Sequence, residues 1–275
     1  MHAFEHQTAF ITGGAQGIGL GIARQLARRG ARLVITDIDE ARLAVAQEEL
    51  GQLSPTSTYV LDVRDRQAFE RIAEDAEDHV GPVSLLFNNA GVAGVGSLSY
   101  DNWDWVIDVN LKGVINGVQC FLSRMQARGQ PAHIINTASV AGVIGSTMSS
   151  PIYNTSKYAV VGLSEALRWQ LEQGGSPVSV SVLCPGAVAT DIISNTLDAK
   201  PGDTHTLREG DLGQALSQAQ DMLLDQGLDT DQVGELVIQG MLENAPFIFT
   251  DRSVAQALSE RTQIMLACMP APQEH

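Results

Sequence analysis

The stretch Thr12-Gly13-Gly14-Ala15-Gln16-Gly17-Ile18-Gly19 decides how this chain folds. It follows an apolar, β-type run, Thr8–Thr12, and it opens a segment with helical periodicity, Ile18–Arg29. Glycine at such a junction permits a tight turn, and the start of the helix offers free backbone N–H groups and a favourable dipole to a phosphate. A glycine cluster alone is weak evidence, but its position between a strand and a helix predicts a dinucleotide-binding turn.

Outward from this turn, short β-branched runs alternate with longer helical patterns. Runs such as Leu33-Val34-Ile35 are apolar on both faces, which is typical of parallel strands covered by helices. The alternation predicts a single-domain, Rossmann-like α/β fold over 1–275, in which a doubly wound parallel sheet of about seven strands has helices on both faces. The predicted strands are Thr8–Thr12, Arg32–Asp37, Thr58–Leu61, Ser84–Asn88, His133–Thr137, Ser179–Cys184 and Phe247–Thr250, and the predicted helices are Ile18–Arg29, Glu40–Leu50, Arg66–His79, Trp103–Arg128, Ile152–Glu172 and Thr230–Asn244.

The composition of the chain indicates which kinds of binding partner to expect. The chain has 275 residues, of which 44% are hydrophobic, and its 32 acidic against 17 basic side chains give a net charge of -15. This charge argues against a nucleic acid or an anionic membrane surface as a partner. No secretory signal pattern and no bilayer-length apolar run is present, so we expect a cytoplasmic protein. The 3 cysteines and 6 histidines are scattered, so we expect no metal site.

Two regions depart from the alternation. The segment of about 191–228 is long and acidic but carries apolar residues such as Ile192 and Leu197, which need something to cover. We therefore interpret it as a lid, with a solvated acidic insertion as the alternative. The segment of about 252–275 is a C-terminal extension with a helical pattern over Arg252–Cys268, and it suits packing or subunit contact better than chemistry.

Asp37 ends the second predicted strand, 18 residues after Gly19. A dinucleotide-binding fold places a carboxylate at this point on the hydroxyls of the adenosine ribose. The same carboxylate repels a 2′-phosphate, and neither Gln16 nor Ile38 offers a cation to bind one. NAD is therefore favoured over NADP, and the alternative is that Asp37 merely caps the next helix.

The segment Tyr153-Asn154-Thr155-Ser156-Lys157 places a phenol and an ammonium group one helical turn apart. A phenol titrates near about 10, and a fixed cation nearby lowers that pKa. The pair is a candidate proton-transfer device, although a Tyr and a Lys at this spacing are also common on helix surfaces.

With these residues in place, the sequence resembles the short-chain dehydrogenase/reductase superfamily. Thr12–Gly19 matches its TGxxxGxG turn, Asn88-Asn89-Ala90-Gly91 its NNAG motif, and Pro185-Gly186 with Thr190 its PG motif. The resemblance covers residues 8 to about 190. One departure is that thirteen residues separate Ser139 from Tyr153, one more than is usual in the family, which affects the loop Ser146–Pro151 beside the expected substrate pocket.

The resemblance implies residue roles. Tyr153 is expected to be the general acid/base, Ser139 to orient the substrate oxygen, Lys157 to lower the pKa of Tyr153 and hold the nicotinamide ribose, and Asn110 to interrupt the helix Trp103–Arg128 and position a water. NAD would contact Gly13, Gln16, Gly17, Ile18, Gly19, Asp37, Asp62, Val63, Asn89, Ala90, Gly91, Tyr153, Lys157, Pro185, Gly186, Val188 and Thr190. The substrate would contact Val95, Val143, Met148, Ile152, Ile192 and Leu197.

The expected activity is that of an NAD-dependent short-chain alcohol dehydrogenase, interconverting a hydrophobic secondary alcohol and its ketone. The stretch from Trp103 to Gly117 is similar to members that oxidise the benzylic alcohol of lignin-derived aryl ethers, so bulky aryl or alicyclic alcohols are the expected substrates. The alternatives are an NADPH-dependent ketoreductase and a non-catalytic, NAD-binding regulatory protein of the same fold. Family members pair through the helices matching Trp103–Arg128 and Ile152–Glu172, which implies a homodimer or homotetramer.

Overall fold

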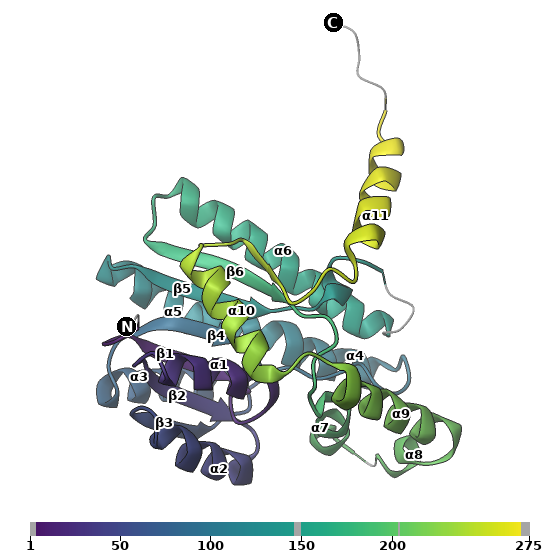
Figure 1. Cartoon of the computed structure of the whole chain (residues 1–275), viewed down its shortest axis with the longest axis horizontal. Coiled ribbons are helices and arrows are strands. Elements are labelled where there is room, and N and C mark those ends of the chain that lie inside the picture. The colour runs from purple at the N-terminus through teal and green to yellow at the C-terminus, as the bar shows by residue number, and fades with distance from the viewer. Residues whose placement is uncertain (1–3, 146–149, 203, 271–275) are drawn as a thin grey trace, which may run out of the picture.

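A parallel sheet forms the centre of the molecule (Figure 1). The computed structural model describes residues 4–145, 150–202 and 204–270. Its 7 strands run in the order β3-β2-β1-β4-β5-β6-β7, so the chain starts in the middle of the sheet and builds first one half and then the other. The predicted Rossmann-like α/β fold is confirmed. The strands are β1 Thr8–Thr12, β2 Arg32–Asp37, β3 Thr56–Val60, β4 Val83–Asn88, β5 Ala132–Thr137, β6 Val178–Cys184 and β7 Phe247–Phe249.

Helices cover both faces of the sheet. Apolar side chains of α1, α2 and α10 pack on one face against residues such as Ile11 and Leu33. Those of α3, α5 and α6 pack on the other face around Phe10. The helices are α1 Gly17–Ala27, α2 Glu40–Gly51, α3 Arg66–His79, α4 Tyr100–Ile107, α5 Gly113–Arg128, α6 Pro151–Gln173, α7 Ile192–Ala199, α8 His205–Arg208, α9 Gly210–Gln226, α10 Thr230–Leu242 and α11 Ala255–Ala267.

The predicted helix Trp103–Arg128 is three segments in the structure. It begins earlier, at Tyr100, because the Ser99 side chain accepts from the N–H of Asn102 and caps the first turn of α4. A π-helical segment, Asp108–Lys112, then separates α4 from α5. Such segments frequently occur at functional sites.

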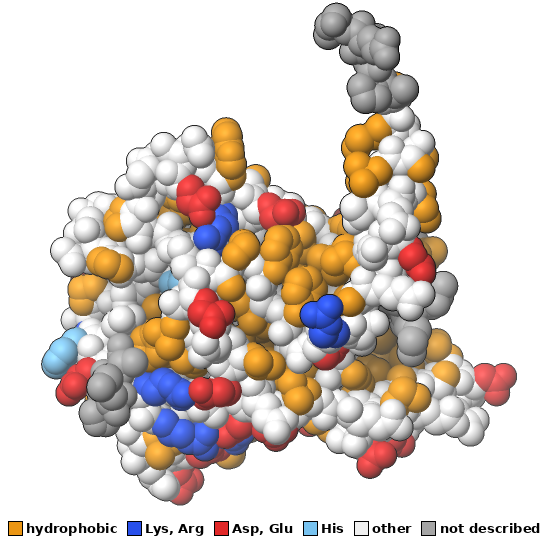
Figure 2. All heavy atoms as spheres, turned by 45° about the horizontal axis from the view of Figure 1, so that its top comes forward, with side chains coloured by type: hydrophobic (Ala, Val, Ile, Leu, Met, Phe, Trp, Pro, Cys, Tyr) orange, Lys and Arg blue, Asp and Glu red, His pale blue; other side chains and the backbone are white. Residues whose placement is uncertain are grey.

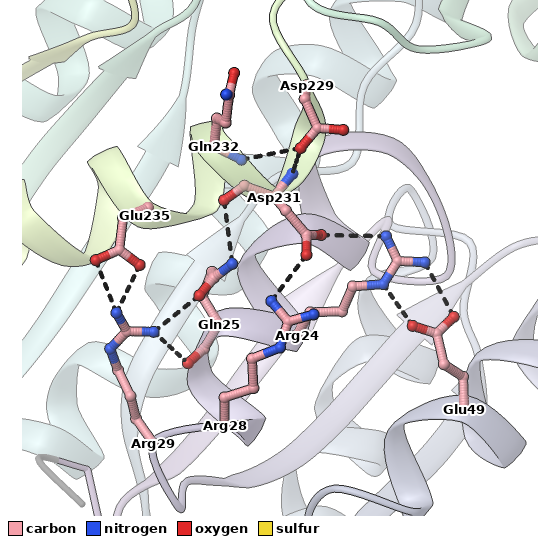
Figure 3. Close-up of polar contacts among 9 residues, drawn as sticks. All are labelled: Arg24, Gln25, Arg28, Arg29, Glu49, Asp229, Asp231, Gln232 and Glu235. Carbon is pink, nitrogen blue, oxygen red and sulfur yellow. Dashed lines mark hydrogen bonds and ion pairs between the residues drawn. The ribbon is translucent and has the colours of Figure 1, made fainter. Parts of the chain in front are cut away.

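Helices α1 and α10 touch backbone to backbone because glycines lie between them. A Cβ added to Gly21 would lie 2.1 Å from the carbonyl oxygen of Thr230, and one added to Gly234 would lie 2.5 Å from that of Gly21. Figure 3 shows the polar network at the rim of this contact, in which Asp231 accepts from Arg24 and Arg28. This contact fixes the C-terminal part of the chain against the helix that follows the glycine-rich turn.

Helix α11 is exposed to solvent, unlike the helices that cover the sheet. None of its residues 255–267 is buried, and the helix projects from the body of the molecule (Figure 1). Hydrophobic side chains lie exposed along this helix (Figure 2). Ile264, Met265 and Leu266 are among the exposed hydrophobic residues of the chain. Among the described residues, no helix is both long and apolar enough to cross a membrane.

Candidate active site

One cavity lies at the carboxyl ends of the strands, where a doubly wound sheet places its ligands. It brings together residues that are far apart in the sequence, from the glycine-rich turn to the start of the lid segment. The residues predicted to contact cofactor or substrate that line it are Gly13, Gln16, Gly17, Ile18, Asp37, Asp62, Val63, Asn89, Ala90, Gly91, Tyr153, Lys157, Pro185, Thr190 and Ile192.

The glycine-rich turn needs its glycines for two reasons. Gly13 and Gly17 have φ values of 60 and 53, in the left-handed region that side chains disfavour. A Cβ on Gly13 would also lie 2.8 Å from the Cα of Ala90. Gly19 does not line the cavity; a Cβ there would run into the carbonyl oxygen of Gly13. The turn is therefore packed tightly against the segment that follows β4.

Asp37 is held by backbone N–H groups at the end of β2. Its carboxylate accepts from the N–H of Ala15 at 3.3 Å and from that of Asp39 at 3.2 Å. Burial nevertheless raises the pKa of Asp37, although the backbone hydrogen bonds act in the opposite direction. The carboxylate thus lies at the cavity wall in a fixed orientation.

Arg64 also lines this cavity, and sequence reasoning missed it. Its guanidinium is engaged by Asp62, with the shortest N–O distance at 2.7 Å. The cation is therefore already paired with a carboxylate. Arg64 directly follows Val63, which was predicted to contact the cofactor, so its place in the sequence offered a signal.

Tyr153 and Lys157 share one face at the start of α6. Ser150 caps the helix by accepting from the N–H of Tyr153 at 3.3 Å, and Pro151 occupies the first turn. One turn later, the Nζ of Lys157 lies 5.6 Å from the centre of the Tyr153 ring and donates to the carbonyl oxygen of Thr137 at 3.0 Å. The predicted proximity of phenol and ammonium group is present.

Burial opposes charge on both groups. It raises the pKa of Tyr153, and a hydrogen bond from Ser139 offsets only part of this effect. Burial lowers the pKa of Lys157 to about 8, so the ammonium form still predominates at neutral pH. The sequence predicted a lowered pKa for the phenol of Tyr153, but its pKa is raised in the structure. Desolvation of the phenol outweighs the stabilisation of its charged form.

Ser139 lies beside Tyr153. Its Oγ accepts from the N–H of Ala141 at 3.1 Å, and its hydroxyl acts to lower the pKa of Tyr153. The two hydroxyls therefore lie near each other at this end of the site.

Asn110 occupies the π-helical segment and is fully buried. Its amide exchanges two hydrogen bonds with the backbone of Val92, at 2.8 and 3.0 Å, and donates to the Oγ of Ser156 at 3.0 Å. The predicted interruption of the long helix is present at this residue. Its contacts join the segment after β4 to α6, between Tyr153 and Lys157.

The segment of about 191–228, interpreted from the sequence as a lid, is hydrogen-bonded to the rest of the site. Thr196 of α7 accepts from the N–H of Ala93 at 2.8 Å, and Asn195 donates to the side chain of Gln16 at 2.7 Å. Gln220 of α9 donates to the carbonyl oxygen of Thr190 at 2.7 Å. Helix α7 therefore lies over the cavity and contacts the glycine-rich turn.

Other predicted residues lie elsewhere. Gly186, Val188, Val95, Ile152 and Leu197 do not line the cavity, and Val143 borders a second pocket together with Tyr158 and Phe249. Met148 falls outside the described residues. The lining residues that sequence reasoning missed are Ile38, Leu61, Arg64, Val92, Trp105, Val109, Thr137, Ala138, Asn195 and Ala199. For Val92 and Ala138 a signal existed, because each directly adjoins a predicted site residue, Gly91 and Ser139.

Fold and site together define a Rossmann-like α/β protein in which a half-buried Tyr153 and a buried Lys157 share a cavity at the strand ends. Residues 7–201 match the family described as short chain dehydrogenase. The "C alpha-dehydrogenase" of Sphingobium sp. (strain NBRC 103272 / SYK-6) is 35% identical over 281 residues, which cover 100% of this chain and 90% of that protein. The chain belongs to the short-chain dehydrogenase family and is an oxidoreductase.

Solved structures give the same result. A short chain dehydrogenase/reductase from Burkholderia phymatum, determined in complex with NAD, has a TM-score of 0.88 and 33% identity, with 100% of each chain covered. The apo form of LigD from Sphingobium sp. strain SYK-6 has a TM-score of 0.78 and 32% identity, and the match covers 98% of this chain and 100% of that one.

Proposed function

We propose that the protein is an NAD-dependent alcohol dehydrogenase that interconverts a hydrophobic secondary alcohol and its ketone, with Tyr153 as the general acid/base. The observation that carries this proposal is the convergence of Tyr153, Lys157 and Asp37 in one cavity. When bound, NAD supplies the acceptor for the hydride that leaves the carbinol carbon.

The catalytic step follows from the contacts of Ser139 and Tyr153. In oxidation, the alcohol proton passes to the oxygen of Tyr153, while Ser139 donates a hydrogen bond to the substrate oxygen and orients it. Because burial raises the pKa of Tyr153, the phenolate needs positive charge nearby, and the Lys157 ammonium supplies it. In the reverse direction Tyr153 returns the proton to the alkoxide oxygen.

The residues at the other end of the cavity fit NAD. Gly13 and Gly17 line the cavity at the turn between β1 and α1, and Asp37 offers a carboxylate for ribose hydroxyls. The same charge disfavours a 2′-phosphate, and the cation of Arg64 is paired with Asp62. The NAD complex of the Burkholderia phymatum relative supports this preference.

Titration with NADH and NADPH, followed by their fluorescence, tests the cofactor. We expect tighter binding of NADH. Tighter binding of NADPH would contradict the role of Asp37 and favour an NADPH-dependent ketoreductase.

The substrate end of the cavity is largely apolar. Val92, Trp105, Val109, Ile192 and Ala199 line it, which favours an aryl or alicyclic secondary alcohol. The match to a C alpha-dehydrogenase over the whole chain supports the same class. A panel of small aliphatic, alicyclic and aryl secondary alcohols, assayed for NADH formation, tests this proposal. The largest kcat/KM is expected for the bulky members. NADH binding without turnover on any member would favour the non-catalytic alternative.

Self-association belongs to the same proposal. The apolar side chains exposed on α11 and the pairing of family members through helices such as α5 and α6 both support a homodimer or homotetramer. Sedimentation of the full chain beside a chain ending at residue 254 tests it. A monomeric full chain would contradict the proposal.

A further inference from the structure

The turn Pro185–Gly186 after β6 is held by the residues that follow β7. The N–H of Gly186 donates to the Oγ1 of Thr250 at 2.9 Å, across 64 positions of sequence. A Cβ on Gly186 would lie 2.1 Å from the Oδ2 of Asp251, so this carboxylate packs closely against the turn. The contact joins a wall of the cavity to the base of the C-terminal extension.

The opposite side of the same turn contacts the catalytic loop. The N–H of Val140 donates to the carbonyl oxygen of Pro185 at 3.0 Å, and Val140 directly follows Ser139. Pro185 also lines the cavity that contains Tyr153. The turn therefore lies at the catalytic end of the cavity, between Ser139 on one side and Thr250 on the other.

Asp251 orients the hydroxyl group of Thr250 by accepting its proton in a hydrogen bond. The hydroxyl of Thr250 donates to the Oδ2 of Asp251 at 3.2 Å, so its single proton is used. The other carboxylate oxygen, Oδ1, accepts from the N–H of Ser253 at 2.7 Å. Because the hydroxyl proton of Thr250 points to Asp251, a lone pair of its Oγ1 is free to accept from the N–H of Gly186.

We propose that Thr250 and Asp251 are positioning residues for the nicotinamide half of the cofactor. The proposal rests on the proposed function, because hydride transfer beside Tyr153 requires the nicotinamide at this end of the cavity. The nicotinamide would contact Pro185, which lines the cavity. Thr250 and Asp251 hold the turn that contains Pro185 in place. The adenosine half would lie at the other end of the cavity, beside Asp37.

The test compares two ligands on matched variants. Thr250→Val removes the acceptor at nearly constant shape, whereas Thr250→Ser keeps it. NADH and ADP-ribose are titrated against each variant, because ADP-ribose carries the adenosine half without the nicotinamide. Loss of one hydrogen bond predicts that Thr250→Val raises the Kd for NADH about fivefold to tenfold. The Kd for ADP-ribose should stay within about twofold of wild type, and Thr250→Ser should restore NADH binding.

Two results would overturn the proposal: an unchanged Kd for NADH in Thr250→Val, or an equal loss of NADH and ADP-ribose binding. Thermal melting of both variants shows whether they are folded, and Asp251→Asn should change NADH binding in the same direction but less. Wild-type protein that prefers NADPH would contradict the proposed cofactor instead. The comparison would then use NADPH and 2′-phospho-ADP-ribose, so the two failures remain separate.

Discussion

The two halves of the sheet prepare the two ends of the cavity in different ways. In the half built by β1 to β3, two backbone N–H groups offset part of the desolvation of the buried Asp37 carboxylate, and glycines bring main chains into contact. In the half built by β4 to β6, desolvation disfavours the charge on three side chains, Tyr153, Lys157 and His133.

This difference predicts how each half responds to mutation. The first half should be sensitive to added volume, because its main chains already touch. The second half should be sensitive to a change in proton binding, because its buried groups hold pKa values away from their usual range. Four variants test this difference between the two halves.

The largest effect is expected for Tyr153→Phe in the second half. Removing the hydroxyl removes the proton acceptor, so kcat should fall by about a thousandfold or more, equivalent to about 4 kcal/mol. The Kd for NADH should change little, because the ring remains. Turnover and NADH titration on the same sample check this prediction. Turnover near the wild-type value would refute Tyr153 as general acid/base.

Gly21→Ala tests the first half. The new Cβ would lie 2.1 Å from the carbonyl oxygen of Thr230, so α1 and α10 must separate. We expect the free energy of unfolding in urea to fall by about 3 kcal/mol. Gly51→Ala is the matched control, because nothing lies within 4 Å of a Cβ at Gly51. Equal stability of the two variants would show that the helix contact is not tight.

His133→Gln tests proton binding in the second half. The Oγ of Ser181 donates to the carbonyl oxygen of Ala245 at 2.6 Å, so the Nε2–H of His133 must donate to Ser181, at 2.8 Å. Burial lowers the pKa of His133 to about 4, from 6.5. Between these values the unfolded chain binds more protons than the folded one, so stability falls as the pH falls through this window, by about 3 kcal/mol in all.

The variant should lose this part of the acid sensitivity, as measured by urea unfolding at a series of pH values. His79→Gln is the control. The pKa of His79 is raised by its contact with Asp75, so its removal cannot reduce the loss of stability in acid. An unchanged pH profile for His133→Gln would contradict the buried neutral imidazole.

The smallest effect concerns cofactor choice in the first half. Asp37→Asn removes the charge that disfavours a 2′-phosphate, so the ratio of the Kd for NADPH to that for NADH should fall about tenfold. Asp39→Asn removes an equal charge from a residue that does not line the cavity, and it should leave the ratio nearly unchanged. Fluorescence titration measures both. Equal ratios for the two variants would mean that net charge, not position, sets the preference.

Much of the fold could be predicted from the sequence because its strands are apolar on both faces. The bounds of β1 and β2 agree with the prediction, and β6 begins one residue earlier, at Val178. The edge strand β3 was less well placed: it begins at Thr56, two residues earlier than predicted, because Thr56 and Ser57 lack the apolar signal. In the long helix, the cap at Ser99 was missed, which shifted its start.

The chemistry of the site could be predicted in part. The Tyr153–Lys157 pair follows from helical spacing, which is a local property. The pairing of Arg64 with Asp62 is also local, two residues apart, whereas the contact between Gly186 and Thr250 depends on how distant segments pack. The net pKa of Tyr153 could not be predicted either, because desolvation depends on everything that surrounds the phenol.

The central claim is that the two ends of the cavity form one NAD-dependent site for a hydrophobic alcohol. The most direct measurement is the rate of reduced cofactor formation from a bulky aryl secondary alcohol, with NAD and with NADP, in wild type and in Tyr153→Phe. The account predicts turnover with NAD, a kcat/KM at least about tenfold lower with NADP, and none in the variant. Faster turnover with NADP, or equal turnover in Tyr153→Phe, would contradict it.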